Sequence, residues 1–70
     1  MAVQVLNKNK NGTYEYTLDS IDELDLLPTK GIDTGSICEV ADGANGLRVF
    51  WFTKGAVIKN IEQDGVWTEI

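Results

Sequence analysis

The stretch Leu47-Arg48-Val49-Phe50-Trp51-Phe52-Thr53 decides how this chain must fold. Aromatic and β-branched side chains favour extended backbone, and successive residues of a strand point to opposite faces. Leu47, Val49 and Trp51 therefore share one face of the expected strand, while Phe50 and Phe52 share the other. Because both faces are apolar, both must be covered.

The size of the chain suggests how the two faces are covered. A chain of 70 residues buries only about 60 % of the surface that its unfolded form exposes. Its single cysteine, Cys38, rules out an intrachain disulfide, so association with another polypeptide is the expected source of extra stability. The alternative is that a folded-over sheet covers the strand within one protomer.

Aromatic side chains on strands of a small domain usually belong to the core or to a subunit contact. Those expected to supply the interface here are Phe50, Trp51, Phe52, Trp67, Tyr14 and Tyr16.

Turn dipeptides divide the rest of the chain into short strands. Asn-Gly and Asp-Gly pairs tolerate the positive φ that tight turns need, and they occur at positions 11–12, 42–43, 45–46 and 64–65. They predict strands over residues 2–7, 13–19, 36–41, 47–53 and 66–70, and a further strand or an ordered loop over 56–61. The first two strands are expected to form a hairpin.

One segment has a helical signature. Ser20-Ile21-Asp22-Glu23 fits a capping box, and Pro28 disfavours helical backbone in the residue before it. The sequence thus predicts an all-β (β-rich) fold in a single domain, residues 1–70. We expect a small antiparallel sheet or meander of five to six short strands, with one short helical turn near residues 21–27.

Charge and composition exclude several classes of function. Six Lys and Arg residues stand against eleven Asp and Glu residues, for a net charge of -5, which disfavours a nucleic-acid partner. No apolar run approaches the roughly 20 residues of a membrane-spanning helix, so no membrane partner is expected. No histidine is present to act as a general base or metal ligand.

Asp33-Thr34-Gly35-Ser36 is the sharpest motif, because an Asp-Thr-Gly-Ser tetrapeptide also marks the active site of aspartic proteases. The preceding segment lacks the apolar strand that leads into that aspartate. We therefore interpret Asp33 and Thr34 as a turn, with Gly35 releasing the chain into a strand.

Two further groups carry no expected chemistry. The carboxylates at positions 19, 22, 23 and 25 lack the alternating ligand spacing of a calcium loop and are expected to be solvated at a helix start. Cys38 has no histidine to activate it and is expected to pack in a strand. We therefore predict no metal, no cofactor and no enzymatic activity.

The second half of the chain has a characteristic succession of short motifs: Leu27-Pro28-Thr29, Gly35-Ser36-Ile37-Cys38-Glu39-Val40-Ala41-Asp42, Arg48-Val49-Phe50-Trp51-Phe52 and Gly65-Val66-Trp67-Thr68-Glu69-Ile70. This succession, over roughly residues 24–70, resembles small proteins encoded in the structural-gene regions of tailed bacteriophages and prophages. The stretch from Thr53 to Gln63 is longer than the tight turn found there in such proteins.

The resemblance implies a non-enzymatic virion structural protein, made in the bacterial host cytoplasm and carried in the virion. The favoured function is an oligomeric capsid decoration or head accessory protein. Its partners would be further copies of itself and a repetitive virion protein such as the major capsid protein. The alternatives are a tail or baseplate accessory protein, and an acidic regulatory or inhibitor protein that binds a host enzyme.

Overall fold

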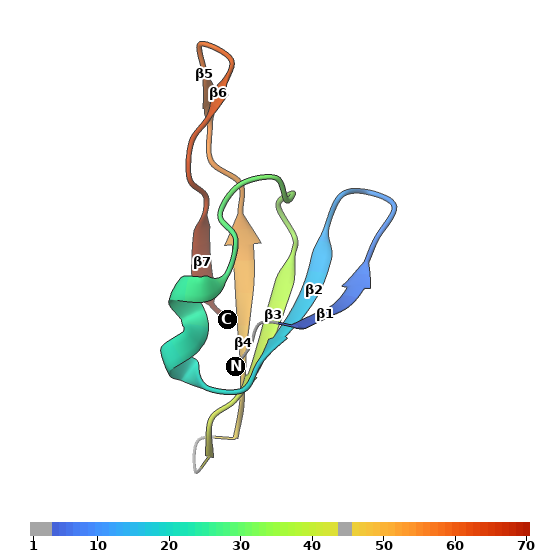
Figure 1. Cartoon of the computed structure of the whole chain (residues 1–70), viewed down its shortest axis with the longest axis vertical. Coiled ribbons are helices and arrows are strands. Elements are labelled where there is room, and N and C mark those ends of the chain that lie inside the picture. The colour runs from blue at the N-terminus through green and yellow to red at the C-terminus, as the bar shows by residue number, and fades with distance from the viewer. Residues whose placement is uncertain (1–3, 44–45) are drawn as a thin grey trace.

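The computed structural model describes residues 4–43 and 46–70 and shows a small all-β fold (Figure 1). Its strands are β1 (Gln4–Lys8), β2 (Tyr14–Leu18), β3 (Ile37–Ala41), β4 (Leu47–Thr53), β5 (Val57–Ile58), β6 (Ile61–Glu62) and β7 (Val66–Glu69). One 3-10 helix, η1 (Ile21–Leu26), lies between β2 and β3. The predicted fold class is confirmed. The start of the first predicted strand and part of the turn at 42–46 lie outside the described residues.

Five strands form one sheet in the order β1-β2-β3-β4-β7, and β5 and β6 form a separate two-stranded ladder. Neighbours in the large sheet are antiparallel except β2 and β3, which are parallel. The sheet is therefore mixed rather than a simple antiparallel meander. Parallel neighbours need a long crossover connection, and the chain between residues 18 and 37 provides it.

The crossover begins as the sequence predicts. The Ser20 side chain accepts a hydrogen bond from the backbone N–H of Asp22, and the Glu23 carboxylate accepts from the N–H of Ser20 at 3.2 Å. These bonds satisfy donors that the start of a helix leaves unpaired. The helix ends at Leu26, before Pro28, so it is short enough to turn back over the sheet.

The crossover covers one face of the sheet, called here the core face. The buried apolar residues on this side are Tyr16, Leu18, Leu27, Ile32, Cys38, Val40, Phe50 and Phe52, with Tyr14, Ile21, Leu24 and Trp67 packed against them. Leu27 and Ile32 come from the crossover and the others, apart from two helical residues, from the sheet. Phe52 is fully buried at the centre.

The opposite side of the sheet, called here the outer face, has no layer above it in the described chain. Trp51 pairs with Ile37 on β3 and with Thr68 on β7, so these three side chains share this face. Val49, two residues away on β4, shares it as well and is half-buried. The two apolar faces of β4 thus differ: the part of the chain that the structure describes covers one face and leaves the other open.

Candidate functional site

The six aromatic residues predicted at an interface divide between the two faces of the sheet. Phe50, Phe52 and Tyr16 are buried in the protomer, with 6 %, 0 % and 5 % of their surface exposed. Tyr14 and Trp67 are half-buried on the same core face. Only Trp51 belongs to the outer face, and it is 41 % exposed.

The rings on the core face pack against one another. Tyr14 and Tyr16 stack at 5.7 Å between ring centroids, and Tyr16 meets the edge of Trp67 at 6.0 Å. Trp67 contacts Phe52 at 5.0 Å, and its indole N–H donates to the Pro28 carbonyl at 3.0 Å. Such pairs contribute about 0.5–1.5 kcal/mol each beyond simple burial. These rings therefore stabilise the protomer, and Trp51 is the one of the six that lies on the outer face.

The Trp51 ring lies next to Gly35 and Thr13. A Cβ atom built on Gly35 would lie 3.6 Å from this ring and 3.5 Å from the methyl group of Thr13. These are ordinary contact distances, so the indole lies along the sheet surface beside Gly35 and Thr13. Trp51, Val49 and Ile37 form an apolar strip across β4 and β3, and we call it the Trp51 strip.

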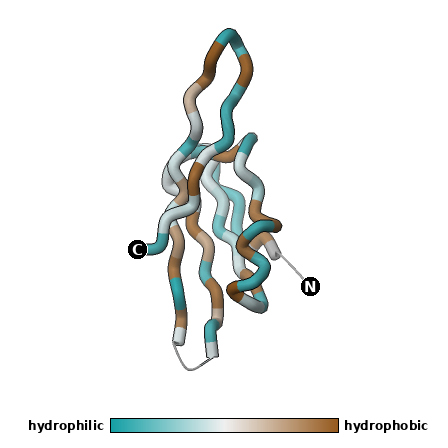
Figure 2. The backbone as a smooth tube through the Cα atoms, turned by 90° about the vertical axis from the view of Figure 1, so that its left-hand side faces the viewer, coloured by the Kyte–Doolittle hydropathy of each residue, from teal (hydrophilic) through white to brown (hydrophobic). Residues whose placement is uncertain are grey.

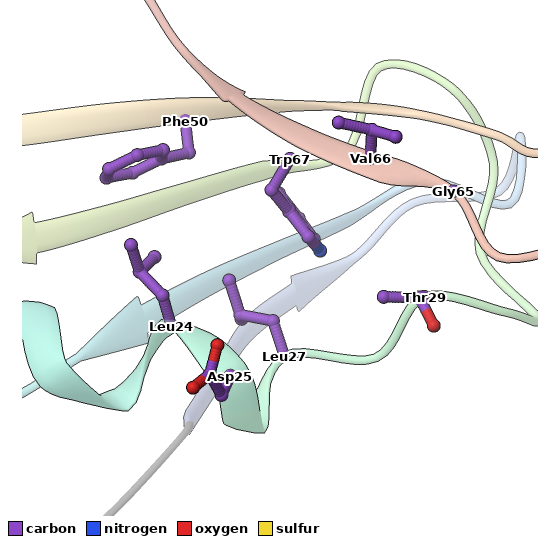
Figure 3. A pocket seen from close by; sticks show the side chains of 8 residues that line it. All are labelled: Leu24, Asp25, Leu27, Thr29, Phe50, Gly65, Val66 and Trp67. Atoms are coloured by element: carbon purple, nitrogen blue, oxygen red, sulfur yellow. The ribbon is translucent and has the colours of Figure 1, made fainter.

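A groove lies on the other side of the molecule, between η1 and the strands β4 and β7 (Figure 3). Its volume is about 430 Å³. The apolar lining comes from Leu24 and Leu27 below and from Phe50 and Trp67 above, with Asp25 at the helix side and Val66 at the border, where its side chain points away from the groove. We call it the η1 groove. It reaches the edge of the sheet, because β7 is the last strand in the described part of the sheet.

A projecting hairpin is the third feature. Strands β5 and β6 leave the sheet between β4 and β7 and extend from one end of the molecule (Figure 1). We call residues 56–63 the arm. Its apolar side chains Val57, Ile58 and Ile61 are all exposed by more than half. Figure 2 shows these hydrophobic segments on both sides of a hydrophilic tip.

The arm corrects one detail of the sequence interpretation, which expected a single strand or a loop over residues 56–61. Lys59 and Asn60 have φ of +52° and +65°, the backbone of a two-residue hairpin turn. In the sequence, the hairpin is indicated by Lys59-Asn60, which separates the apolar residues Val57 and Ile58 from Ile61. The glycine that normally marks such a turn is missing. The η1 groove had no sequence signal, because its two walls are far apart in the chain.

The Asp33-Thr34-Gly35-Ser36 motif forms the predicted turn. The Ser36 N–H donates to the Asp33 carbonyl at 3.2 Å, and Gly35 has φ of +102°. The buried Ser36 hydroxyl donates to the same carbonyl at 2.9 Å and accepts from the N–H of Tyr14 at 3.0 Å. Asp33 pairs with Lys54 at 3.5 Å. The motif therefore joins the crossover to β2 and to the end of β4.

Cys38 is fully buried, and burial, followed by the nearby Glu39 charge, raises the pKa of its thiol to about 11. We expect the native protein not to react with a thiol reagent near pH 8 and to react fully in urea, because the thiolate is the reactive form. A Thr68→Cys variant, exposed on the outer face, provides the matched control and should react at once. Immediate native reaction at Cys38 would contradict its placement.

The acidic residues near η1 do not converge. No group of three or more His, Cys, Asp or Glu side chains in the described residues is arranged to hold a metal ion. Glu23 is engaged in the helix cap, where it also accepts from the N–H of Asp19 at 3.1 Å. Within the same residues, no helix is long and apolar enough to cross a membrane.

Ion pairs stabilise the sheet edge near the C-terminal end of β7. Arg48 donates two hydrogen bonds to Glu69, at 2.8 and 2.6 Å, and a third to Asp42 at 3.0 Å. Hydrogen bonding to Arg48 lowers the pKa of Glu69, and desolvation partly opposes this effect. Because this pKa is lower in the folded state, the contribution to stability exists above the unfolded pKa and disappears as pH falls through the folded one.

We therefore expect a Glu69→Gln variant to unfold at a lower urea concentration than the parent chain at pH 7. The difference should shrink as the pH falls below about 4, where the unfolded carboxyl takes up its proton. Urea titrations at pH 7 and at low pH measure it. A difference that is the same at both pH values would contradict a role for the charged form of Glu69.

Comparison with known proteins gives no match: no family model, no curated protein and no solved structure is significantly similar to the chain.

Proposed function

We propose that this chain is a non-enzymatic accessory protein of a tailed bacteriophage or prophage particle. It self-associates and binds a repeated protein surface of the particle, in the first place the major capsid protein. It is made in the host cytoplasm and carried in the virion. The sequence resemblance over residues 24–70 suggests the setting, and the exposed apolar surface suggests the binding role.

The observation that carries the proposal is the contrast between the two faces of β4. Phe50 and Phe52 are buried by the chain itself, whereas Trp51 between them is 41 % exposed. Exposed tryptophan in an apolar setting is typical of the anchor residues that dominate protein interfaces. The Trp51 strip is therefore assigned to the particle surface. Many identical copies on a repeated surface would strengthen modest contacts through avidity.

Co-sedimentation tests this proposal with particles produced by the phage or prophage genome that encodes the chain. We expect the chain to pellet with intact particles, and a Trp51→Ala variant to bind at least about tenfold more weakly, because an interface tryptophan is often worth 2 kcal/mol or more. The matched control is Thr68→Ala, which alters the residue paired with Trp51 on the same face. Failure to pellet with head or tail preparations would overturn the proposal.

Salt distinguishes this function from that of an acidic inhibitor. Charge-based binding weakens at 1 M salt, where the screening length is about 3 Å, whereas apolar binding survives. Retention of the chain on the particles at high salt is expected. Release by salt, with no loss in the Trp51→Ala variant, would favour a contact made by the carboxylates. Separate sedimentation of heads and tails reports which part of the particle is bound.

A further inference from the structure

The arm presents its apolar side chains in a fixed arrangement. Ile58 pairs with Ile61 next to the turn, so both side chains lie on one face of the hairpin, while Val57 and Glu62 occupy the other. Ile58 is 55 % exposed and Ile61 is 63 % exposed. A lone two-stranded hairpin is at best marginally stable in water. The isoleucine face therefore lacks the cover that such a hairpin needs.

The base of the arm is nevertheless firmly held. The Gln63 N–H donates to the Ala56 carbonyl at 2.8 Å, and a side chain on Gly55 would collide with the carbonyls of Gln63 and Asp64. The Glu62 carboxylate accepts from the N–H of Gly31 at 2.9 Å, tying the arm to the crossover. The arm is thus set in one direction before any partner binds, which lowers the entropic cost of docking.

The direction of the arm excludes its own groove as the binding site. The arm extends from one end of the molecule, whereas the η1 groove lies beside the body of the sheet, between η1 and β7 (Figure 1). An arm can enter this groove only on another molecule. The groove opens at the free side of β7, so an incoming hairpin need not displace a strand of the described sheet.

The arm and the groove are complementary in polarity and charge. The groove is apolar where Leu24, Leu27 and Trp67 face one another, and Asp25 stands on its helix side (Figure 3). Within the described residues, the side chain of Asp25 forms no ion pair or hydrogen bond, and neither does the side chain of Lys59 at the tip of the arm. Lys59 also has φ of +52°, a conformation that glycine or asparagine adopts more easily.

We propose that the η1 groove of one copy receives the arm of a second copy of this chain. Ile58 and Ile61 fill the groove, and Lys59 lies beside Asp25. This inference deepens the self-association in the proposed function and rests on it. If two copies exchange arms, they form a closed dimer. If each copy instead inserts its arm into the groove of the next, a ring or an open chain forms, because the contact joins two different surfaces, the arm and the groove.

Light scattering during size-exclusion chromatography of the full chain tests this contact over a range of protein concentrations. At the highest concentration we expect a mass of at least twice the 7.7 kDa of one chain. A double variant, Ile58→Ser with Ile61→Ser, should raise the concentration of half-association at least about tenfold. Val57→Ser is the matched control, equally exposed on the other face of the arm, and should leave the mass unchanged. A parent chain that stays monomeric would overturn the inference.

Charge reversal identifies the groove as the receiving site. Lys59→Asp and Asp25→Lys should each weaken association, and the two variants combined in one chain should restore it. Circular dichroism checks that each variant keeps its fold. If the combined variant is as weak as the single ones, Lys59 and Asp25 are not in contact and the inference fails.

The test of the arm contact, which measures oligomeric mass, gives a result independent of the test of particle binding. Trp51→Ala should reduce particle binding and leave the oligomeric mass unchanged, because the Trp51 strip lies on the opposite side of the sheet from the groove. A chain that associates but does not bind particles would contradict the particle binding alone. A monomeric chain that binds particles would contradict the self-association together with the arm contact, and would leave the particle binding intact. A chain that associates regardless of Ile58 and Ile61 would contradict the arm contact alone.

Discussion

Replacing Phe52 with alanine is expected to lower the free energy of unfolding by about 3–5 kcal/mol, the usual cost of removing a buried aromatic ring. Phe52 is 0 % exposed and contacts Trp67 at 5.0 Å between ring centroids. Small domains have only about 5–15 kcal/mol of stability in total, so the variant should be largely unfolded in mild denaturant. Urea titration followed by circular dichroism measures the loss, at a fixed low protein concentration.

The adjacent residue supplies the control for this experiment. Trp51→Ala removes a larger ring from the next position on the same strand, but from the exposed outer face. It should cost far less stability than Phe52→Ala. Similar losses from both substitutions would show that the two faces of β4 are equally covered, contrary to the fold.

Gly65→Ala is expected to have the second largest effect on stability. A Cβ atom at this position would lie 2.5 Å from the Thr53 carbonyl oxygen and closer still to the ring of Phe52. Phe52 is fully buried and the carbonyl belongs to the backbone of β4, so neither can move away cheaply. Overpacking of this kind costs about 1–3 kcal/mol, and we expect the upper end here.

The matched control for Gly65 is Gly31→Ala. Gly31 has φ of +80° and open space around its Cα, so alanine there meets only the conformational cost of about 1 kcal/mol. Urea titration of both variants distinguishes the cost of the steric collision at Gly65 from the cost of the backbone conformation at Gly31. A Gly65→Ala variant more stable than Gly31→Ala would contradict the close approach of β7 to β4.

The strands and the helix cap could be predicted because their signals are local. Asn11-Gly12 marks a hairpin turn, and Gly12 has φ of +89° as such a turn requires. Ser20 and Glu23 mark the start of η1 through hydrogen bonds that involve only neighbouring residues. The alternation in β4 likewise separates Trp51 from Phe50 and Phe52 without any knowledge of the rest of the chain.

Which face of β4 is covered depends on residues distant in the sequence and could not be predicted. Leu27 and Ile32 close the core face from an irregular segment that has no apolar period. The same crossover makes β2 and β3 parallel, where short turns had suggested a meander. The division of the six proposed interface aromatics into core and outer face therefore required the folded chain.

The arm was missed for a related reason. Its turn is Lys59-Asn60, and lysine is not a residue that normally marks positive φ. The apolar residues Val57, Ile58 and Ile61 fit a buried strand as well as an exposed hairpin. In the folded chain these residues project beyond the end of the sheet (Figure 2), and the described residues leave each of their side chains more than half exposed.

The most direct measurement is hydroxyl-radical footprinting with mass spectrometry, which reads the accessibility of individual side chains. In the dilute free protein we expect Trp51 to be oxidised readily, and Phe50 and Phe52 to be protected, as their exposure of 41 %, 6 % and 0 % requires. On phage particles, Trp51 should become protected while Phe50 and Phe52 do not change. Equal oxidation of Trp51 in the free and bound protein, or protection of Trp51 in the free monomer, would contradict the assignment of the outer face to a partner.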